Sequence, residues 1–376
     1  MRLVFYSVIL NHHQVWVADE LYSLLGSDYH FVETAYSSEN KGGSDYSNRP
    51  YLIKAWENRE AYDLAMTLAV TSDACVFGGI ESLPFQKERL KKNLLSFSMG
   101  ERSLKKGWVN LFSRTNIISI SNYWSNRYYN KPLFKLCCSA FTKSDFESLR
   151  MFTNKCFKWG YFTKVENFDF EASWEISRKG LTSILWCARF LSWKHPELPI
   201  HLAKRLKEEG YKFHLDMIGS GEKYDDIVAL SKSLGVEDVV SFMGNLPNDE
   251  VLQQMRSHQV FLFTSDRNEG WGAVANESMS NGCVLVASKE IGSAPYLVKD
   301  GYNGFLFDSN NIESAYEKIK WLIENPDKIF DLQRNAYDSM KRLWNPKCAA
   351  ENLLTLINNI KQGNDTSIKE GPCSRA

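Results

Sequence analysis

Short apolar runs and amphipathic segments of helix length alternate along the whole chain. This alternation predicts parallel strands that are each followed by a covering helix, and therefore an α/β fold. The pattern is most regular in the second half, where two further helices are expected at 312–324 and 326–343. The runs that predict strands are 3–10, 30–35, 74–79, 94–99, 116–121, 135–140 and 156–162 in the first half, and 183–190, 213–221, 239–245, 259–265, 283–288 and 304–308 in the second.

The length of 376 residues exceeds what one core usually holds, so we expect two domains. Segment 165–180 is polar and lacks strand periodicity, which indicates a boundary there. We predict one Rossmann-like, doubly wound domain at 1–170 and a second at 178–344, followed by a helix at about 345–361. Residues 363–376 are polar and contain Gly, Pro and Ser, which predicts a disordered tail. In such domains ligands bind at the carboxyl ends of the strands, so we expect a cleft between the two.

The formal net charge is zero but is unevenly distributed, with 21 Lys+Arg and 15 Asp+Glu in residues 1–165 against 24 and 30 in the remainder. The basic half either meets an anionic surface or substrate, or reflects ordinary scatter of solvated charges. The zero net charge favours no class of partner, and we expect no nucleic-acid partner. Eight cysteines without CxxC spacing suit a reducing compartment. No apolar run is long enough for a signal peptide or a membrane span, so we expect a cytoplasmic protein.

Two strand ends in the second half carry groups suited to phosphate. Arg189 and Lys194 stand at the end of the run 183–190 and just beyond it. A guanidinium and an ammonium there form either a clamp for a diphosphate or a solvated basic loop. The next strand leads into Gly219, which suits a tight turn, and Gly221, which permits close approach of the backbone to a ligand. A glycine pair without the third glycine of the dinucleotide fingerprint is weak evidence for a nucleotide site.

The loop and helix after the run 259–265 hold two glutamates, Glu269 and Glu277. The helix is predicted to end at Gly282, and its start after glycines presents unpaired amides that attract an anion. Eight helical positions span roughly 12 Å, which is near the length of a sugar-diphosphate-ribose unit. One carboxylate can accept hydrogen bonds from hexose hydroxyls and the other from ribose hydroxyls, with the diphosphate against the amides between them.

The stretch from Val260 to Phe307 resembles the retaining glycosyltransferases of family 4, which have the GT-B fold of two Rossmann-like domains facing a central cleft. The resemblance covers essentially the second half of the chain. It rests on features that stand in the family's order: the Arg189/Lys194 pair, IGSGE (218–222), the Glu269/Glu277 pair, SNGCVLVAS (280–288) and IGSAPYLVKDGYNGFLF (291–307).

The resemblance implies a role for each matched position. Arg189 and Lys194 would contact the donor diphosphate and Glu269 the transferred sugar, so these three are the catalytic candidates. Glu277 would hold the ribose, and the loop Gly244-Asn245-Leu246 would border the nucleobase. The glycine-flanked tryptophan would offer amides to phosphate or sugar. The helix at about 345–361 would return to the first domain. The remaining donor-binding candidates are Gly221, Asn245, Leu246, Gly270, Trp271 and Gly272.

The chain departs from the family's pattern at two places. Glycines stand before the arginine and after the lysine in many members, whereas this chain has Ala188 and His195. Many members also have a glycine-rich loop after the first strand, where this chain has NHHQ (11–14). Any phosphate contact from the first domain would then come from imidazole and amide side chains rather than from close backbone approach.

The first half offers further candidates for acceptor or phosphate binding. His12 and His13 directly follow the first strand and should face the cleft, although a surface turn is the alternative. No further His or Cys falls at the spacing that a zinc site needs. Glu101 and Arg102 follow another strand, where they either bind the acceptor or form a structural ion pair.

Residues 86–106 carry seven Lys or Arg against two Glu, with leucines and Phe97 interleaved. The pattern suits peripheral docking to the inner face of an anionic membrane, as a lipid-linked acceptor would require, or a solvated helix face.

Together these patterns predict a retaining glycosyltransferase that moves a hexose-type sugar from a nucleotide-sugar to a hydroxyl of a saccharide or lipid-linked saccharide, in O-antigen or capsule assembly. No cofactor or divalent metal is expected, because Arg189 and Lys194 can supply positive charge to the leaving diphosphate and the chain has no DxD motif. The alternative is a catalytically inactive protein of the same fold that binds glycans or acts as a scaffold. An epimerase or a phosphorylase of this fold is less well supported.

Overall fold

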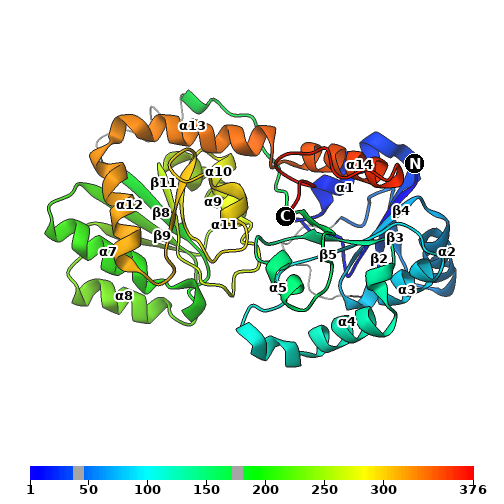
Figure 1. Cartoon of the computed structure of the whole chain (residues 1–376). Coiled ribbons are helices and arrows are strands. Elements are labelled where there is room, and N and C mark those ends of the chain that lie inside the picture. Colours follow the sequence, from blue (N-terminus) through cyan, green and yellow to red (C-terminus); the bar gives the residue numbers. More distant parts are fainter. Residues whose placement is uncertain (37–45, 172–180) are drawn as a thin grey trace. The chain divides into compact units, whose positions relative to one another are not determined.

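The computed structural model describes residues 1–36, 46–171 and 181–376, and these form two compact units. The first unit contains Met1–Lys164 together with Trp344–Ala376, and the second contains Val165–Leu343. Each unit is built on one parallel sheet with helices packed on both of its faces (Figure 1). The α/β class and the pair of Rossmann-like domains predicted from the alternating pattern are therefore present.

The sheet of the first unit has the strand order β3-β2-β1-β4-β5-β6-β7, and every pairing in it is parallel. The two central strands are buried along their whole length, as expected when helices cover both faces. The strands are β1 (Leu3–Ser7), β2 (Tyr29–Glu33), β3 (Leu52–Lys54), β4 (Ala74–Gly78), β5 (Ser96–Gly100), β6 (Leu133–Cys137) and β7 (Cys156–Lys158). The principal helices are α1 (Val15–Leu25), α2 (Arg59–Thr71), α3 (Leu83–Lys91), the 3₁₀ segment η3 (Gly107–Phe112), α4 (Arg114–Ser125), α5 (Thr142–Ser148) and α14 (Pro346–Lys361).

One predicted strand is wrong. The run 116–121 lies inside helix α4, whose start is capped by the Ser113 hydroxyl accepting a hydrogen bond from the Asn116 N–H at 3.3 Å. Asn116, Ile120 and Tyr123 follow one another at helical spacing and share the side that packs inward. Isoleucine and serine alternate here as in a strand, but the alternation covers too few residues to distinguish a strand from a helix. Edge strand β3 is three residues long and was not predicted.

The expected disordered tail is ordered instead. Residues 363–376 return to the edge of β7, where the Cys373 N–H donates to the Lys158 carbonyl at 2.7 Å and the Lys158 N–H donates to the Ser374 carbonyl at 2.8 Å. The side chain of Cys373 is fully buried. The tail therefore satisfies backbone groups that an edge strand would otherwise leave open. Helix α14 belongs to the first unit and packs on α1.

The sheet of the second unit has the order β10-β9-β8-β11-β12-β13, again with parallel pairings throughout. All six predicted strands of this half are present. They are β8 (Thr182–Cys187), β9 (Phe213–Ile218), β10 (Val240–Gly244), β11 (Val260–Phe263), β12 (Val284–Ser288) and β13 (Gly304–Phe307). The helices are α7 (Glu197–Glu208), α8 (Tyr224–Ser233), α9 (Asn248–Ser257), α10 (Val274–Ser280), α11 (Ala294–Leu297), α12 (Ile312–Glu324) and α13 (Pro326–Arg342).

The boundary between the units lies between Lys164 and Val165. Part of the predicted linker packs on the second unit, where the rings of Phe168 and Phe170 lie 5.1 and 5.9 Å from the ring of Tyr337. The rest of the linker and the predicted start of the second domain at 178 fall outside the described residues.

Strand order places one topological switch point in each sheet, where successive connections leave in opposite directions. In the first sheet it lies between β1 and β4, and in the second between β8 and β11. Ligands of open parallel sheets bind at the carboxyl ends of the strands beside such a point. The loops that follow β8 and β11 therefore form the expected ligand-binding edge of the second unit.

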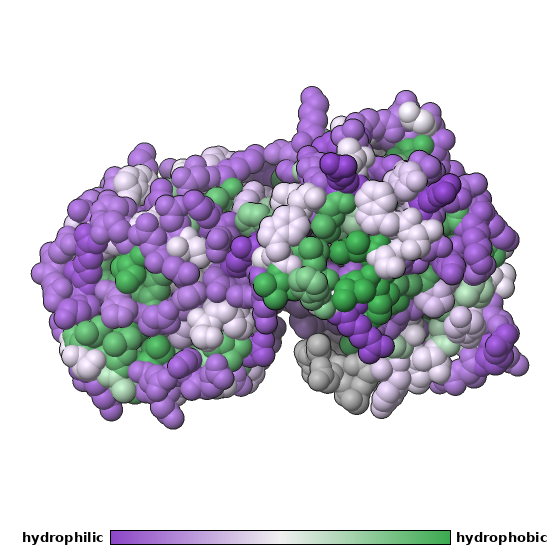
Figure 2. Space-filling model, turned by 60° about the horizontal axis from the view of Figure 1, so that its bottom comes forward, coloured by the Kyte–Doolittle hydropathy of each residue, from purple (hydrophilic) through white to green (hydrophobic). Residues whose placement is uncertain are grey.

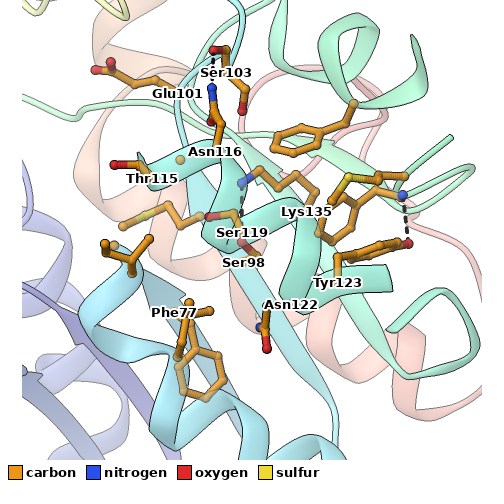
Figure 3. A pocket seen from close by; sticks show the side chains of 18 of the residues that line it. Phe77, Ser98, Glu101, Ser103, Thr115, Asn116, Ser119, Asn122, Tyr123 and Lys135 are labelled. Atoms are coloured by element: carbon orange, nitrogen blue, oxygen red, sulfur yellow. Dashed lines mark hydrogen bonds between the residues drawn. The ribbon is translucent and has the colours of Figure 1, made fainter. Parts of the chain in front are cut away.

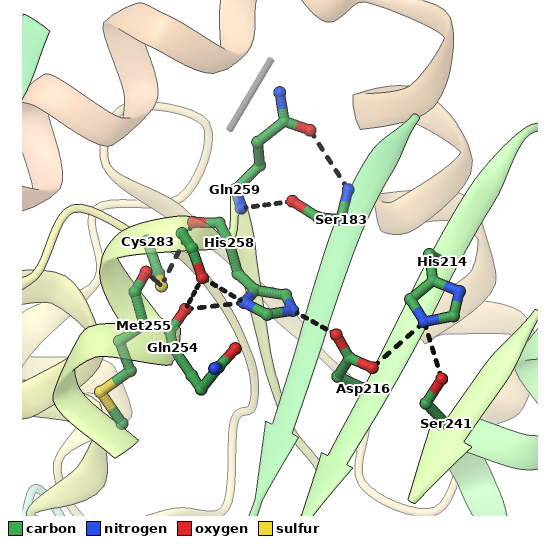
Figure 4. Close-up of polar contacts among 10 residues, drawn as sticks. Ser183, His214, Asp216, Ser241, Gln254, Met255, His258, Gln259 and Cys283 are labelled. Carbon is green, nitrogen blue, oxygen red and sulfur yellow. Dashed lines mark hydrogen bonds and ion pairs between the residues drawn. The ribbon is translucent and has the colours of Figure 1, made fainter. Parts of the chain in front are cut away.

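Away from that edge, a polar network ties β9 to the segment that precedes β11 (Figure 4). The Asp216 carboxylate lies 2.9 Å from His258 Nε2 and 3.1 Å from His214 Nε2. His258 Nδ1 lies 2.6 Å from the Gln254 carbonyl, which only accepts, so this nitrogen carries a proton. Burial alone would raise the pKa of Asp216, but the hydrogen bonds and positive charge of the two histidines outweigh it and lower that pKa.

We expect Asp216→Asn to lower the free energy of unfolding by roughly 1–3 kcal/mol at pH 7. A carboxylate with a lowered folded pKa stabilises the fold above its unfolded pKa of about 3.9 and loses that contribution as the pH falls through the folded value. The loss caused by Asp216→Asn should therefore shrink between pH 5 and pH 3. Urea unfolding at several pH values measures it, with the exposed Asp226→Asn on α8 as the control. An equal loss at every pH would contradict the assignment.

Candidate functional site

The loops that follow β8 and β11 are fastened to each other at the switch point of the second sheet. The Thr264 hydroxyl donates to the Lys194 carbonyl at 2.6 Å and accepts from Trp186 Nε1 at 2.9 Å. The Asp266 N–H donates to the Trp193 carbonyl at 3.1 Å. These bonds hold the backbone of one loop against the other, so the side chains that the loops carry are placed as a set.

The Lys194 ammonium and the Glu269 carboxylate form an ion pair between the two loops, and both side chains are buried. The ammonium also lies 4.2 Å from the ring centre of Trp193 and 5.6 Å from that of Phe263, within reach of their negative faces. The sequence predicted both residues as catalytic candidates, and the structure brings them together. A buried pair of this kind is strongly coupled, because removing one partner leaves the other charge unpaired.

Two charged groups predicted for the site have no partner among the described residues. Arg189 is exposed and forms no ion pair there. The side-chain carboxylate of the half-buried Glu277, at the first turn of α10, accepts no hydrogen bond from any described group, and removal from water raises its pKa to about 7. Burial raises the pKa of Cys187, at the end of β8. The negative charge of Glu277 adds to this increase, and the positive charge of Lys194 opposes it. Glu277 and Lys194 therefore both act on the end of the central strand.

The glycine-flanked tryptophan has a structural side chain and open amides beside it. Trp271 is buried, and its Nε1 donates to Asn276 Oδ1 at 2.8 Å. Gly272 has φ of +84°, and a Cβ there would lie 2.7 Å from the Phe263 ring, so only glycine fits. In the described chain, the backbone N–H groups of Gly270 and Gly272 donate to no protein acceptor. The amides, rather than the indole, are the groups available to a ligand.

The turn after β9 is constrained by the loop after β8. A Cβ on Gly219 would lie 2.0 Å from the Ala188 carbonyl oxygen, and one on Gly221 would lie 2.6 Å from that of Phe190. The close backbone approach that the sequence predicted at Gly221 is therefore an approach to the protein itself. Asn245 and Leu246 follow β10 at the same edge of the sheet, with Asn245 exposed.

His195, which stands where a glycine is common in the resembled family, joins the site. Its backbone has φ of +50°, its Nδ1 lies 2.9 Å from Glu197 Oε1, and its Nε2 lies 3.4 Å from Asp266 Oδ2. The hydrogen bond with Glu197 chiefly raises the pKa of His195, although burial acts against it. Sequence reasoning noted His195 only as a departure, and it missed Thr264 and Asp266, because no local pattern reveals a contact between two loops about 70 positions apart.

In the first unit, His12 and His13 follow β1 at the switch point. The ring of His13 stacks on that of Tyr161 at 4.8 Å and lies 3.7 Å from that of His12. Burial, assisted by His12, lowers the pKa of His13 to about 4, so its imidazole is neutral at pH 7. His13 Nδ1 and the neighbouring Gln14 Oε1 are buried without a hydrogen-bond partner in the described chain. A neutral imidazole can donate or accept a hydrogen bond there but does not supply charge.

Glu101 and Arg102 are each held by protein partners. Arg102 forms a buried ion pair with Asp145, whose carboxylate also accepts from the Leu104 N–H at 2.8 Å. Glu101 is paired with Lys105 at 2.5 Å and accepts from the Tyr161 hydroxyl at 2.6 Å. Of the two readings left open by the sequence, the ion pair is the one present for Arg102.

The basic segment 86–106 is not one solvated face. Arg89 is fully buried and donates to the backbone carbonyls of Ala69, Ser72, Asp73 and Leu95 at 2.7–3.1 Å. Its guanidinium thus ties the end of α2 to the start of β5.

Large exposed apolar side chains follow this segment on η3. Trp108, Val109 and Phe112 are 59%, 74% and 81% exposed. Figure 2 turns the α4 side of the first unit toward the reader and shows apolar side chains gathered there among hydrophilic ones. Residues 102–144 contain eight Lys or Arg and no Asp or Glu.

Within residues 1–36, 46–171 and 181–376, no group of three or more His, Cys, Asp or Glu has a metal-binding arrangement. No helix in those ranges combines the length and apolar character needed to cross a bilayer.

Sequence comparisons place the second unit among known proteins. Residues 171–339 match the family model described as glycosyl transferases group 1. An uncharacterized glycosyltransferase of Methanocaldococcus jannaschii is 32% identical over 136 residues, which are 36% of this chain and 38% of that protein. A Campylobacter jejuni N-acetylgalactosaminyltransferase acting on a diphospho-undecaprenol-linked sugar is 28% identical over 184 residues, 47% of this chain and 48% of that protein. The chain thus spans well under two thirds of these relatives.

Solved structures resemble the whole chain. Anabaena HepE in complex with UDP has a TM-score of 0.68 at 14% identity, covering 96% of this chain and 99% of that one. The sucrose-phosphate synthase of Thermosynechococcus elongatus has a TM-score of 0.68 at 13% identity, covering 97% and 100%. At such identities the likeness speaks for the fold. The chain therefore has the GT-B fold of two Rossmann-like units, and its second unit matches the glycosyl transferases group 1.

Proposed function

We propose that the protein is a retaining glycosyltransferase that moves a hexose-type sugar from a nucleotide-sugar to a hydroxyl of a saccharide or lipid-linked saccharide in surface polysaccharide assembly. The observation that carries the proposal is the set of charges at the β8/β11 switch point: the Lys194–Glu269 pair, with Arg189 and Glu277 unpartnered in the described chain. The group 1 match and the diphospho-undecaprenol-linked substrate of the C. jejuni relative support it.

In this proposal the donor lies along the carboxyl edge of the second sheet. Arg189 and Lys194 bind the diphosphate, because both cations stand at the end of the central strand. Glu277 accepts hydrogen bonds from the ribose hydroxyls, and Glu269 does so from the sugar. The open amides of Gly270 and Gly272 add donors to phosphate or sugar, and the exposed loop at Asn245 borders the base.

Bond breaking between the sugar and the diphosphate develops negative charge on the leaving phosphate and positive charge on the sugar. Arg189 and Lys194 stabilise the first, so no metal ion is needed. The acceptor attacks from the face that the diphosphate leaves, and a departing phosphate oxygen takes its hydroxyl proton. The configuration at the anomeric carbon is then retained. The rival proposal, an inactive scaffold of the same fold, requires none of these groups to act.

The test is sugar transfer from a panel of labelled UDP-, GDP-, dTDP- and ADP-sugars to saccharide acceptors, with product configuration read by proton NMR. We expect retention of configuration, activity that survives EDTA, and a loss of at least 100-fold in kcat/KM for Arg189→Met, which disturbs no protein contact. Lys232→Met, an exposed cation on α8 of the same unit, is the control. Inversion, or loss of activity with EDTA, would reject the mechanism. Nucleotide-sugar binding without transfer would favour the scaffold.

Donor binding should depend on pH through Glu277, whose pKa is about 7. The ionised carboxylate is the better acceptor for ribose hydroxyls, so affinity for UDP-glucose should rise about tenfold from pH 6 to pH 8. The diphosphate of such a donor does not titrate in this range. Isothermal titration calorimetry measures the dependence, and Glu277→Gln should abolish it. A wild-type affinity that is flat across the same range contradicts the ribose role.

We propose further that the protein meets an anionic bilayer through η3, rather than through 86–106. Trp108, Val109 and Phe112 can enter the lipid interface while Lys106 and Arg114 face the headgroups, and no carboxylate from 102 to 144 opposes them.

The double variant Trp108→Ser/Phe112→Ser should bind vesicles that contain phosphatidylglycerol at least tenfold more weakly than the wild type. Vesicle co-sedimentation measures this, with Trp56→Ser as a control for an exposed aromatic elsewhere on the first unit. Binding that is unchanged in the double variant removes η3 as the contact.

A further inference from the structure

A cavity of about 500 Å³ lies within the first unit, lined by β4, β5, β6, helices α3 and α4 and the segments before those two helices (Figure 3). Its lining combines polar and apolar groups. Ser98 lies on β5, Lys135 on β6, and Ser119 and Tyr123 come from α4. This size suits one or two sugar rings rather than a long glycan.

Lys135 is a buried cation without an anion. Its side chain comes from the middle of β6 and reaches Ser98 Oγ at 3.3 Å. The ammonium lies 4.7 Å from the ring centre of Phe146 and 5.8 Å from that of Phe152. No carboxylate of the described chain forms an ion pair with it, and burial lowers its pKa.

The other charges around the cavity are already neutralised. Glu101 is the one carboxylate in the lining, and it is paired with Lys105. Arg102 is paired with Asp145. Lys135 therefore stands alone among the lining cations, and a buried charge without a counter-ion is costly unless a ligand supplies one.

The surroundings of Lys135 leave room for a ligand atom beside the ammonium. Gly100 faces it, and a Cβ at that position would already lie 3.3 Å from Nζ. The hydroxyls of Ser119 and Thr115 form no hydrogen bond to the described chain, so they can bind the hydroxyls of a sugar. Figure 3 shows Lys135 and Ser98 in the middle of the cavity, with the α4 side chains around them.

We propose that this cavity binds a carboxylate-bearing sugar, with Lys135 as the group that recognises the acid. One ammonium balances one negative charge, which a carboxylate carries, whereas a phosphate dianion would bring a second, unbalanced charge into the same buried place. The inference rests on the proposed function in one respect: the acidic sugar would be part of the acceptor, which makes this unit the acceptor-selecting one.

The test compares glucuronate with glucose and galacturonate with galactose on the full-length protein, by saturation-transfer NMR and calorimetry. We expect the wild type to bind each acid at least tenfold more tightly than its neutral parent, and Lys135→Met to remove that difference. Lys92→Met, an exposed lysine outside the cavity, should keep it. Ser119→Ala serves as a second cavity variant if Lys135→Met does not fold, and it should weaken binding of acid and neutral sugar alike.

Equal affinity for acid and neutral sugar in the wild type would overturn the proposal, as would discrimination that survives Lys135→Met. Tighter binding of inorganic phosphate than of either uronate, lost in Lys135→Met, would replace the carboxylate by phosphate chemistry and also reject it.

Failure of the cavity and failure of the proposed transferase are distinguishable. Uronate binding that depends on Lys135, without transfer from any donor in the panel, would keep the cavity and reject the reaction. Transfer to neutral acceptors alone, lost in Arg189→Met but untouched in Lys135→Met, would keep the reaction and reject the cavity.

Discussion

The buried ion pair between Lys194 and Glu269 is the constraint on which the candidate donor site depends. Two loops that leave neighbouring strands in opposite directions carry one charge each, and neither charge can stay buried alone. Thr264 and Asp266 fasten the same loops through their backbones. Lys194 and Glu269 neutralise each other, whereas the side chains of Arg189 and Glu277 have no charged or hydrogen-bonding partner in the described chain.

Three glycines at this site allow neighbouring protein segments to pack closer than a side chain would permit. Gly219 and Gly221 bring the turn after β9 onto the backbone after β8, and Gly272 lets the β11 loop fold over Phe263. Each of these glycines has a backbone φ that a side chain would oppose. These close contacts define the path of the loops that carry the open amides and the charged groups.

In the first unit, two groups of cations have no carboxylate partner in the described chain. At the surface, Lys106 and Arg114 lie beside exposed aromatic and aliphatic side chains on η3. In the interior, Lys135 lines a cavity that α4 helps to form. Two other cations of the same unit have protein partners. Arg89 donates hydrogen bonds to backbone carbonyls, and Arg102 forms an ion pair with Asp145.

The sequence alone determined the α/β class, all six strands of the second sheet and the identity of the charged groups at its edge. Apolar periodicity reports burial along one element, and parallel strands that are buried on both faces leave a strong pattern. It misassigned 116–121, where isoleucine and serine alternate inside a helix, and 363–376, where a polar tail pairs with β7. Only the tertiary structure decided which charged side chains pair. Lys194 pairs with Glu269, 75 positions away, and Arg102 pairs with Asp145, 43 positions away. Lys135 pairs with no carboxylate in the described chain. Such pairings depend on the strand order, which brings distant loops to one edge of the sheet. No local pattern of residues encodes that order.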